Sequence, residues 1–298
     1  MGASLMLVVS LLVGLLGSVI AKYYTAHARG ARSSFLFSAV NCAVAALLLL
    51  LFGGVGTPSL FTLLLGALFG ALTALQGVMS LTSLRHGPMS YTAVIVSFST
   101  LMPALSGVLF FEEKAGWVQA VGIGLMLVSF LLAVKTGKEE IKVYFTWILF
   151  CTITFLATGS MGILQKVHQN TVYKGESDEF LIVSFIVSAL LCALFALFWR
   201  DKKANERDKT PLKQKKRWLF PLLMIVSGVT VALNNRFNLY LSGVMDSALF
   251  FPVINGGGLV LSSLAAAVLF RERLTPRQWL GVAIGILSVV FLCDPFSS

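Results

Sequence analysis

Long apolar runs follow one another along the whole chain and constrain its fold more than any other feature. A helix needs about 17–25 predominantly apolar residues to cross a hydrocarbon core of about 30 Å. Ten ranges are of this kind: 4–22, 34–53, 58–83, 88–111, 117–135, 144–166, 179–199, 217–242, 246–270 and 277–293. The sequence therefore predicts an all-α membrane protein with ten transmembrane helices. The first range is expected to be a helix and not a signal peptide, because no basic residue precedes it.

The charged residues are few, and their distribution follows the predicted loops. Only 12% of the 298 residues are charged, against about 25% in a soluble domain. Loops after odd-numbered runs hold 19 Lys and Arg residues, nine of them in the 200–217 loop, and loops after even-numbered runs hold three. The positive-inside rule predicts that the 200–217 loop lies in the cytoplasm and both termini outside. We expect the protein in the plasma (inner) membrane. The net charge of +10 is therefore no sign of nucleic-acid binding.

An internal repeat appears when the chain is shifted by 159 residues, which places 110–129 on 269–288. Phe111, Glu113, Gln119, Gly122 and Ser129 then meet Phe270, Glu272, Gln278, Gly281 and Ser288. Because each half holds five runs, an odd number, the halves must cross the membrane in opposite senses. The sequence thus predicts two inverted five-helix repeats, 1–136 and 137–298, with the substrate site between them near the midplane.

The stretch "GPMSYTAVIVSFSTLMPALSGVLFFEEKAGWVQAVGIGLMLVSFLLAV" (87–134) resembles the EamA-type repeat of the drug/metabolite transporter superfamily. The second copy keeps the turn "RERLTPRQWLG" but has "MDSA" in place of the Gly-Pro start, and Pro252 lies earlier than Pro103. The resemblance implies a ten-helix carrier of small metabolites that works by alternating access. It does not specify the substrate. Many members of the superfamily keep both termini in the cytoplasm, which the charge distribution here does not predict.

Three asparagines and an arginine interrupt the apolar run "VALNNRFNLYLSG" (231–243). At about 100° per residue, Asn234, Asn235 and Asn238 share one helix face, and Arg236 falls on the opposite side. Polar groups are costly in hydrocarbon, so such a face is expected to line a cavity or to bind another helix. Cavity lining is favoured because the repeat places Gln76 on Asn235. For Arg236, snorkelling to the headgroups and substrate binding both stay open.

Four further residues are candidate substrate contacts. Gln76 and Asn41 lie deep in the third and second runs, and Asn255 lies in "PVINGGG" (252–258). That stretch combines a proline with three glycines, so the ninth run is expected to be broken or bent, unless the glycines serve close packing. Tyr91 is the candidate for aromatic stacking on a solute.

Several kinds of chemistry find no support in the sequence. All thirteen acidic residues fall in predicted loops or at helix ends, so the embedded carboxylate needed for proton-for-cation antiport is absent. Glu113 and Glu272, in the two repeated turns, are interpreted as capping or ion-pairing residues. No phosphate-binding loop or metal-ligand motif is present, and the four cysteines all fall in apolar runs. We therefore expect no enzyme activity, cofactor or metal.

The residues best fit a secondary transporter of a small polar metabolite that is neutral, zwitterionic or weakly anionic. Amide side chains would supply its hydrogen bonds. The alternatives are a flippase for a lipid-linked amphiphile, an exchanger of anionic metabolites that uses Arg236, and a membrane sensor or scaffold. The expected partners are the solute and membrane lipid, and not nucleic acid. A coupling ion, a counter-substrate and a homodimer stay open.

Overall fold

The computed structural model describes residues 2–27, 31–54, 56–86, 92, 95–113, 116–133, 145–199, 219–269 and 274–293. Its α-helices are α1 (Ala3–His27), α2 (Ala31–Phe52), α3 (Leu60–His86), α5 (Leu101–Phe110), α6 (Trp117–Ala133), α7 (Phe145–Gln169), α8 (Ser177–Phe198), α9 (Leu219–Val244), α10 (Ser247–Leu269) and α11 (Pro276–Leu292). Two 3₁₀ turns accompany them, η1 (Phe98–Thr100) and η2 (Lys174–Glu176). Each predicted apolar range overlaps one of these helices.

Seven of the described helices are long and apolar enough to cross a membrane: α1, α2, α3, α7, α8, α9 and α10. The ranges Ile95–Phe110, Trp117–Leu132 and Pro276–Leu292 form shorter apolar helices. Large apolar side chains such as Leu51, Leu190 and Phe198 are exposed on the surface of the bundle. Exposing such side chains to water is unfavourable, whereas contact with apolar lipid tails is not.

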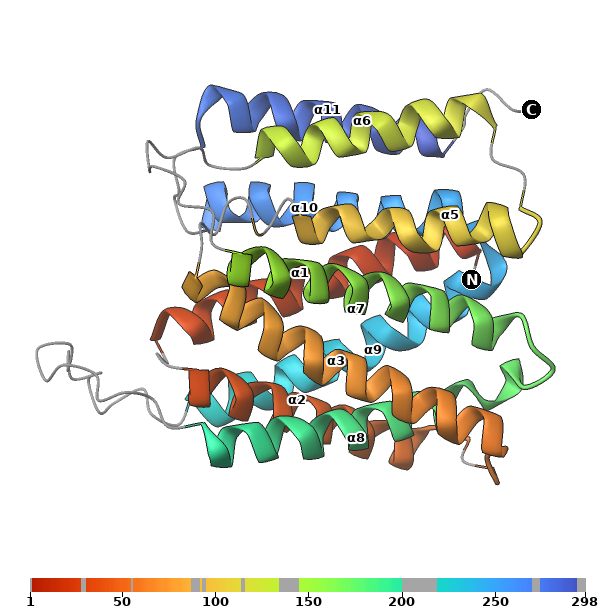
Figure 1. Cartoon of the computed structure of the whole chain (residues 1–298), viewed down its shortest axis with the longest axis vertical. Helices are drawn as coiled ribbons and strands as arrows, with labels where there is room; N and C mark the ends of the chain where they lie inside the picture. The colour runs from red at the N-terminus through yellow and green to blue at the C-terminus, as the bar shows by residue number, and fades with distance from the viewer. Residues whose placement is uncertain are drawn as a thin grey trace, which may run out of the picture.

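The helices stack in layers, as Figure 1 shows. At one edge α6 packs along α11, and next to this pair α5 packs on α10. At the other edge α2 packs along α8. Between these layers, α3 packs on α7 and α8, and α9 packs on α1 and α2. We call α1, α2, α3, α7, α8 and α9 the first group, and α5, α6, α10 and α11 the second group.

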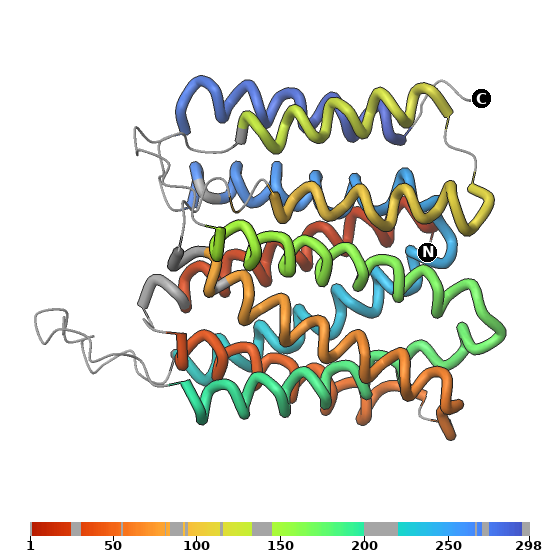
Figure 2. The backbone as a smooth tube through the Cα atoms, viewed as in Figure 1, coloured from red at the N-terminus to blue at the C-terminus, as the bar shows by residue number. Residues whose placement is uncertain are grey.

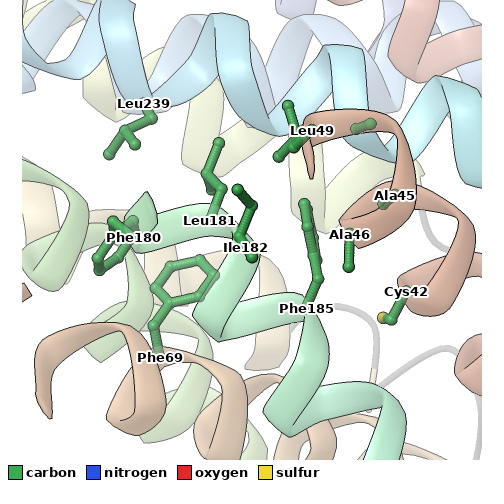
Figure 3. Packing of buried hydrophobic residues seen from close by; sticks show 11 residues of the cluster. Cys42, Ala45, Ala46, Leu49, Phe69, Phe180, Leu181, Ile182, Phe185 and Leu239 are labelled. Atoms are coloured by element: carbon green, nitrogen blue, oxygen red, sulfur yellow. The ribbon is translucent and has the colours of Figure 1, made fainter. Parts of the chain in front are cut away.

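Each group has its own apolar core. In the first group, Phe69 on α3 packs against Phe180 on α8, and Leu49 and Leu239 lie in the same cluster (Figure 3). The second group is centred on a cluster that Leu7 of α1 and Leu241 of α9 join from the first group; its other members include Met126, Phe130, Phe250, Phe251 and Leu292. The groups meet where α1 contacts α10 and where α7 contacts α5. The space enclosed between them holds the polar residues described below.

The expected break in the ninth run is wrong, because α10 continues through Pro252 and the three glycines. A proline removes one hydrogen bond, here the bond to the carbonyl of residue 248, and the flanking turns keep theirs. A Cβ at Gly256 would collide with Met126 of α6, so this glycine serves close packing. The irregular backbone lies instead in the first copy, where η1 precedes α5.

The helix ends place the termini relative to the long basic loop. In Figure 2 the start of α1 and the end of α11 lie at one end of the bundle. The end of α8 and the start of α9, which flank the 200–217 loop, lie at the other end. The end of α7, with η2 after it, is on the side of the termini.

Candidate functional site

Three adjacent cavities lie between α1, η1, α5, α7, α9 and α10. The first, of about 150 Å³, is lined by Phe69, Ser99, Thr100, Pro103, Thr158, Met161, Gly162, Gln165, Asn235, Asn238, Phe250, Phe251, Ile254 and Asn255. The second, of about 250 Å³, is lined by Ser10, Leu11, Gly14, Leu15, Ser18, Asn234, Asn238, Ile254, Asn255, Gly258 and Ser262. The third, also about 250 Å³, is lined by Val96, Ser97, Ser99, Phe130, Thr158, Asn255, Gly258, Leu259 and Ser262. Because they share walls, we call them together the central cavity.

Helix α9 contributes three asparagines to the lining of the central cavity. Asn238 lines the first two cavities, Asn235 the first and Asn234 the second. The hydroxyl of buried Ser10 on α1 donates to Oδ1 of Asn238 at 2.6 Å and lies 3.0 Å from Oδ1 of Asn234. Nδ2 of Asn235 donates to the carbonyl of Val231 in its own helix at 2.9 Å. In the described part of the chain this leaves Nδ2 of Asn234 and Asn238 and Oδ1 of Asn235 without hydrogen-bond partners.

Asn255 on α10 lines all three cavities. Its Nδ2 donates to Oγ1 of Thr100 at 3.2 Å and to the carbonyl of Phe251 at 3.0 Å. These bonds fix the amide, and its Oδ1 has no partner among the described residues. Gly258, one turn further along α10, has open space where a Cβ would be. The glycine run thus packs tightly at Gly256 and widens the cavity at Gly258.

Sequence reasoning missed several lining residues. Gln165 on α7 is buried, lines the first cavity and makes no hydrogen bond within the described residues. It recurs with Thr158 at a spacing of seven residues, which is two helical turns, so both lie on one face of α7. Its amide in an apolar run was a usable signal of the kind that singled out Gln76. The hydroxyls of Ser99 and Thr100 gave no such signal, because Ser and Thr are common in membrane helices.

Other candidate residues lie outside the lining of the central cavity. Asn41 on α2 is buried and donates from Nδ2 to the Ser227 hydroxyl on α9 at 3.0 Å, an interhelical bond. Gln76 is half-buried on α3 and is not among the lining residues. Tyr91 lies outside the described residues.

Arg236 projects away from the asparagine face. Its Nη2 donates to Oδ2 of Asp178, at the start of α8, at 2.8 Å. The arginine side chain is 47% exposed and contributes to none of the three cavities. The ion pair therefore fixes the end of α9 to the start of α8.

A buried ion pair lies beside the central cavity. Lys166 follows Gln165 and is one of the three basic residues assigned from the sequence to loops after even-numbered runs, but the structure places it inside α7. It pairs with Glu113 in the turn between α5 and α6, with side chains 5% and 9% exposed. Glu113 has the capping and pairing role expected of it, since its Oε2 also accepts the backbone N–H of Ser247 at 2.6 Å. Glu272 lies outside the described residues.

The central cavity is polar but carries no charge among the described residues that line it. Its amides and hydroxyls donate and accept hydrogen bonds, and Phe69, Phe250 and Phe251 form an apolar part of the wall. No group of three or more His, Cys, Asp or Glu in the described ranges is arranged to hold a metal ion. The arrangement can hold an uncharged or internally neutralised polar solute.

Comparison with known proteins assigns the family. The pattern of the EamA-like transporter family matches residues 145–293, half of the chain. The chain belongs to the EamA-like transporter family. Family membership confirms the resemblance to the drug/metabolite transporter superfamily. It identifies the protein as a multi-pass integral membrane protein of a transporter family.

This EamA-like chain is also similar to a bacterial protein and to a solved structure. An uncharacterized protein of Haemophilus influenzae is 24% identical over 200 residues, which are 65% of this chain and 62% of that protein. The chain thus spans about 62% of the length of this relative. A solved structure titled "Crystal structure of protein" superposes with a TM-score of 0.72 at 13% identity and covers 97% of this chain and 99% of its own. At that identity the likeness concerns the fold alone.

Proposed function

We propose that this EamA-like transporter is a secondary carrier for a small, hydrogen-bonding metabolite without a large net charge. The observation that supports this most directly is the central cavity, whose amides keep unused donors and acceptors. A buried charge without a partner costs several kcal/mol, so a cavity without charged residues disfavours strongly ionic solutes. Neutral and zwitterionic solutes fit best, and a weak anion fits if its charge reaches the amide N–H groups.

We further propose that the chain forms two inverted five-helix repeats and that the three shorter helices also cross the membrane. Equivalent residues in the two halves make equivalent contacts. The backbone N–H of Gly116 donates to Oε1 of Gln119 at 2.9 Å, and that of Thr275 donates to Oε1 of Gln278 at 3.0 Å. Both pairs of positions are 159 residues apart. A shared capping pattern before α6 and α11 is expected of a repeat and not of chance apolar similarity.

Alternating access follows from this arrangement as the working mechanism. The first and second groups each have an apolar core, and the central cavity lies between them. Rocking of one group against the other would open the cavity to each side in turn. The plasma membrane is the proposed location, with both termini outside.

The proposal is tested by transport and stability measurements on four proteins: wild type, Asn235→Leu, Gln165→Leu and the control Asn41→Leu. Solutes found in a thermal-stabilisation screen are then measured for uptake into proteoliposomes. Asn235→Leu is a clean variant, because its Nδ2 bonds only to its own helix. We expect Asn235→Leu and Gln165→Leu to lose uptake and stay folded, and Asn41→Leu to keep uptake. Wild-type uptake in both cavity variants would contradict the proposal.

No specific observation favours the anionic exchanger or the lipid-linked flippase. Both need Arg236 to meet a phosphate or a carboxylate of the substrate. In the structure this guanidinium is paired with Asp178, away from the central cavity.

A further inference from the structure

The Lys166–Glu113 pair joins three segments at one end of the central cavity. Lys166 comes from α7, in the first group, and Glu113 from the turn between α5 and α6, in the second. Nζ of Lys166 also donates to the carbonyl of Met245 at 3.0 Å, and Glu113 accepts the N–H of Ser247. Met245 lies in the connection between α9 and α10, and Ser247 is the first residue of α10. The pair therefore fixes α7 to both turns at this end.

The pair lies directly beside the solute cavity. Gln165, the residue before Lys166, lines the first cavity, and so does Phe250, three residues after Ser247. One turn before Lys166, a Cβ on Gly162 would meet Pro103 and Phe251 at 2.8 to 3.0 Å. Helices α5, α7 and α10 thus pack closely at this level, where Gly162, Pro103 and Phe251 also line the first cavity. The ion pair lies one turn further along α7, toward the end of the bundle where the termini lie.

Apolar contacts also join the two groups. Leu7 near the start of α1 and Leu241 near the end of α9 belong to the same buried cluster as Phe250 and Phe251. This cluster therefore connects α1 and α9 of the first group with α6, α10 and α11 of the second.

The turn that carries Glu113 is built with backbone strain. Glu112 has φ of 56°, the left-handed region that residues with a Cβ rarely adopt. The backbone N–H groups of Phe111 and Glu113 both donate to the carbonyl of Gly107 at 3.1 Å. Such strain persists where the surroundings fix it. Here it directs the Glu113 carboxylate back toward α7 and the start of α10.

We propose that Lys166 and Glu113 form the gate contact of this transporter, which must break for the cavity to open toward the side of the termini. A buried pair suits this role because separating the groups lets water reach both charges, so the open state does not leave them unsolvated. The attraction between the two charges is weaker once water surrounds them than in the protein interior. Both the closed and the open state are therefore accessible. This inference rests on the proposed alternating access.

Cysteine labelling tests the gate without any solute. The parent protein carries Cys293→Ser, because Cys42, Cys151 and Cys192 are buried and Cys293 is exposed. Thr158→Cys, deep in the first and third cavities, reports access to a membrane-impermeant thiol reagent in sealed proteoliposomes. In a separate protein, Gly175→Cys marks the compartment that faces the gate, since η2 is exposed and a Cβ there meets nothing within 4 Å.

The test variant combines Glu113→Gln with Lys166→Met, so that no unpaired charge is left buried to prevent folding. In this variant we expect the labelling rate of Thr158→Cys from the Gly175 side to rise about tenfold or more. Such a rise corresponds to an equally large shift of the population toward the open state. The matched control is Glu112→Gln, a neighbouring exposed glutamate without a described partner, which should leave the labelling rate unchanged.

Two results would overturn the gate: an unchanged rate in the double variant, or an equal rise from both sides, which reports general loosening. The labelling measures access of the reagent to the cavity and not transport of a solute. It therefore tests the gate separately from the proposed carrier function. Faster labelling from the Gly175 side in a protein that moves no solute would keep the gate and reject the carrier.

Discussion

Ser129 on α6 and Ser288 on α11, 159 residues apart in the sequence, form reciprocal contacts. The Ser129 hydroxyl donates to the carbonyl of Gly281 at 2.7 Å, and that of Ser288 donates to the carbonyl of Gly122 at 2.6 Å. Donors and acceptors are both 159 residues apart. Each of the two helices thus donates the same kind of hydrogen bond to the other across the α6–α11 contact.

This reciprocity predicts matched costs for Ser129→Ala and Ser288→Ala. Each variant should lower the free energy of unfolding by about 0.6 kcal/mol, the average for interhelical hydrogen bonds in membranes. Unfolding in detergent micelles measures the loss. Ser263→Ala is the control, because that hydroxyl bonds to Leu259 in its own helix. An equal loss at Ser263 would show that the interhelical bonds carry no special weight.

Two glycines of α3 should respond in opposite ways to alanine. A Cβ on Gly70 would collide with the backbone carbonyl of Ser184 on α8, whereas one on Gly77 meets nothing within 4 Å. Gly70→Ala should cost about 1–3 kcal/mol of unfolding free energy through overpacking. Gly77→Ala should be neutral or gain up to about 1 kcal/mol from helix propensity. Similar stabilities of the two variants would be evidence against the close α3–α8 contact.

Arg236→Lys should change neither transport nor stability by much. The arginine is partly exposed and donates one hydrogen bond, to Asp178, within the described part of the chain, and a lysine reproduces this pairing as a point charge. Exposed ion pairs contribute about 0.2–1 kcal/mol, so the expected loss lies within that range. Uptake assays and thermal unfolding measure both effects. Lost uptake with normal folding would instead indicate a substrate anion bound by the guanidinium fork.

The proposed topology makes a labelling prediction. Cysteines placed at Gly2 and at Gly175 lie at the same end of the bundle and should react with a thiol reagent added outside intact cells. A cysteine in the 200–217 loop should react only after the membrane is permeabilised. Reaction of the Gly2 cysteine only from the cytoplasmic side would reverse the orientation that the positive-inside rule predicts.

The composition of the candidate site could be predicted from the sequence only in part. Asn234, Asn235, Asn238 and Asn255 were singled out because an amide in an apolar run is costly, and all four line the central cavity. Asn41 satisfied the same criterion, yet it bonds to Ser227 between two helices. A helical wheel gives the angle between residues of one helix, but it does not say which neighbour each face meets.

The sequence by itself determined the apolar helices, the match between the two charged turns at an offset of 159 residues, and the polar face of α9. These properties depend on neighbouring residues or on periodic patterns, so they can be read from the order of the residues. Tertiary structure alone decided that Gln165 faces the cavity, that α10 continues through Pro252, and that Lys166 is buried against Glu113. Lys166 and Glu113 are 53 positions apart in the sequence. Only the packing of α7 against the second group brings their charges together and removes the water that would otherwise solvate them.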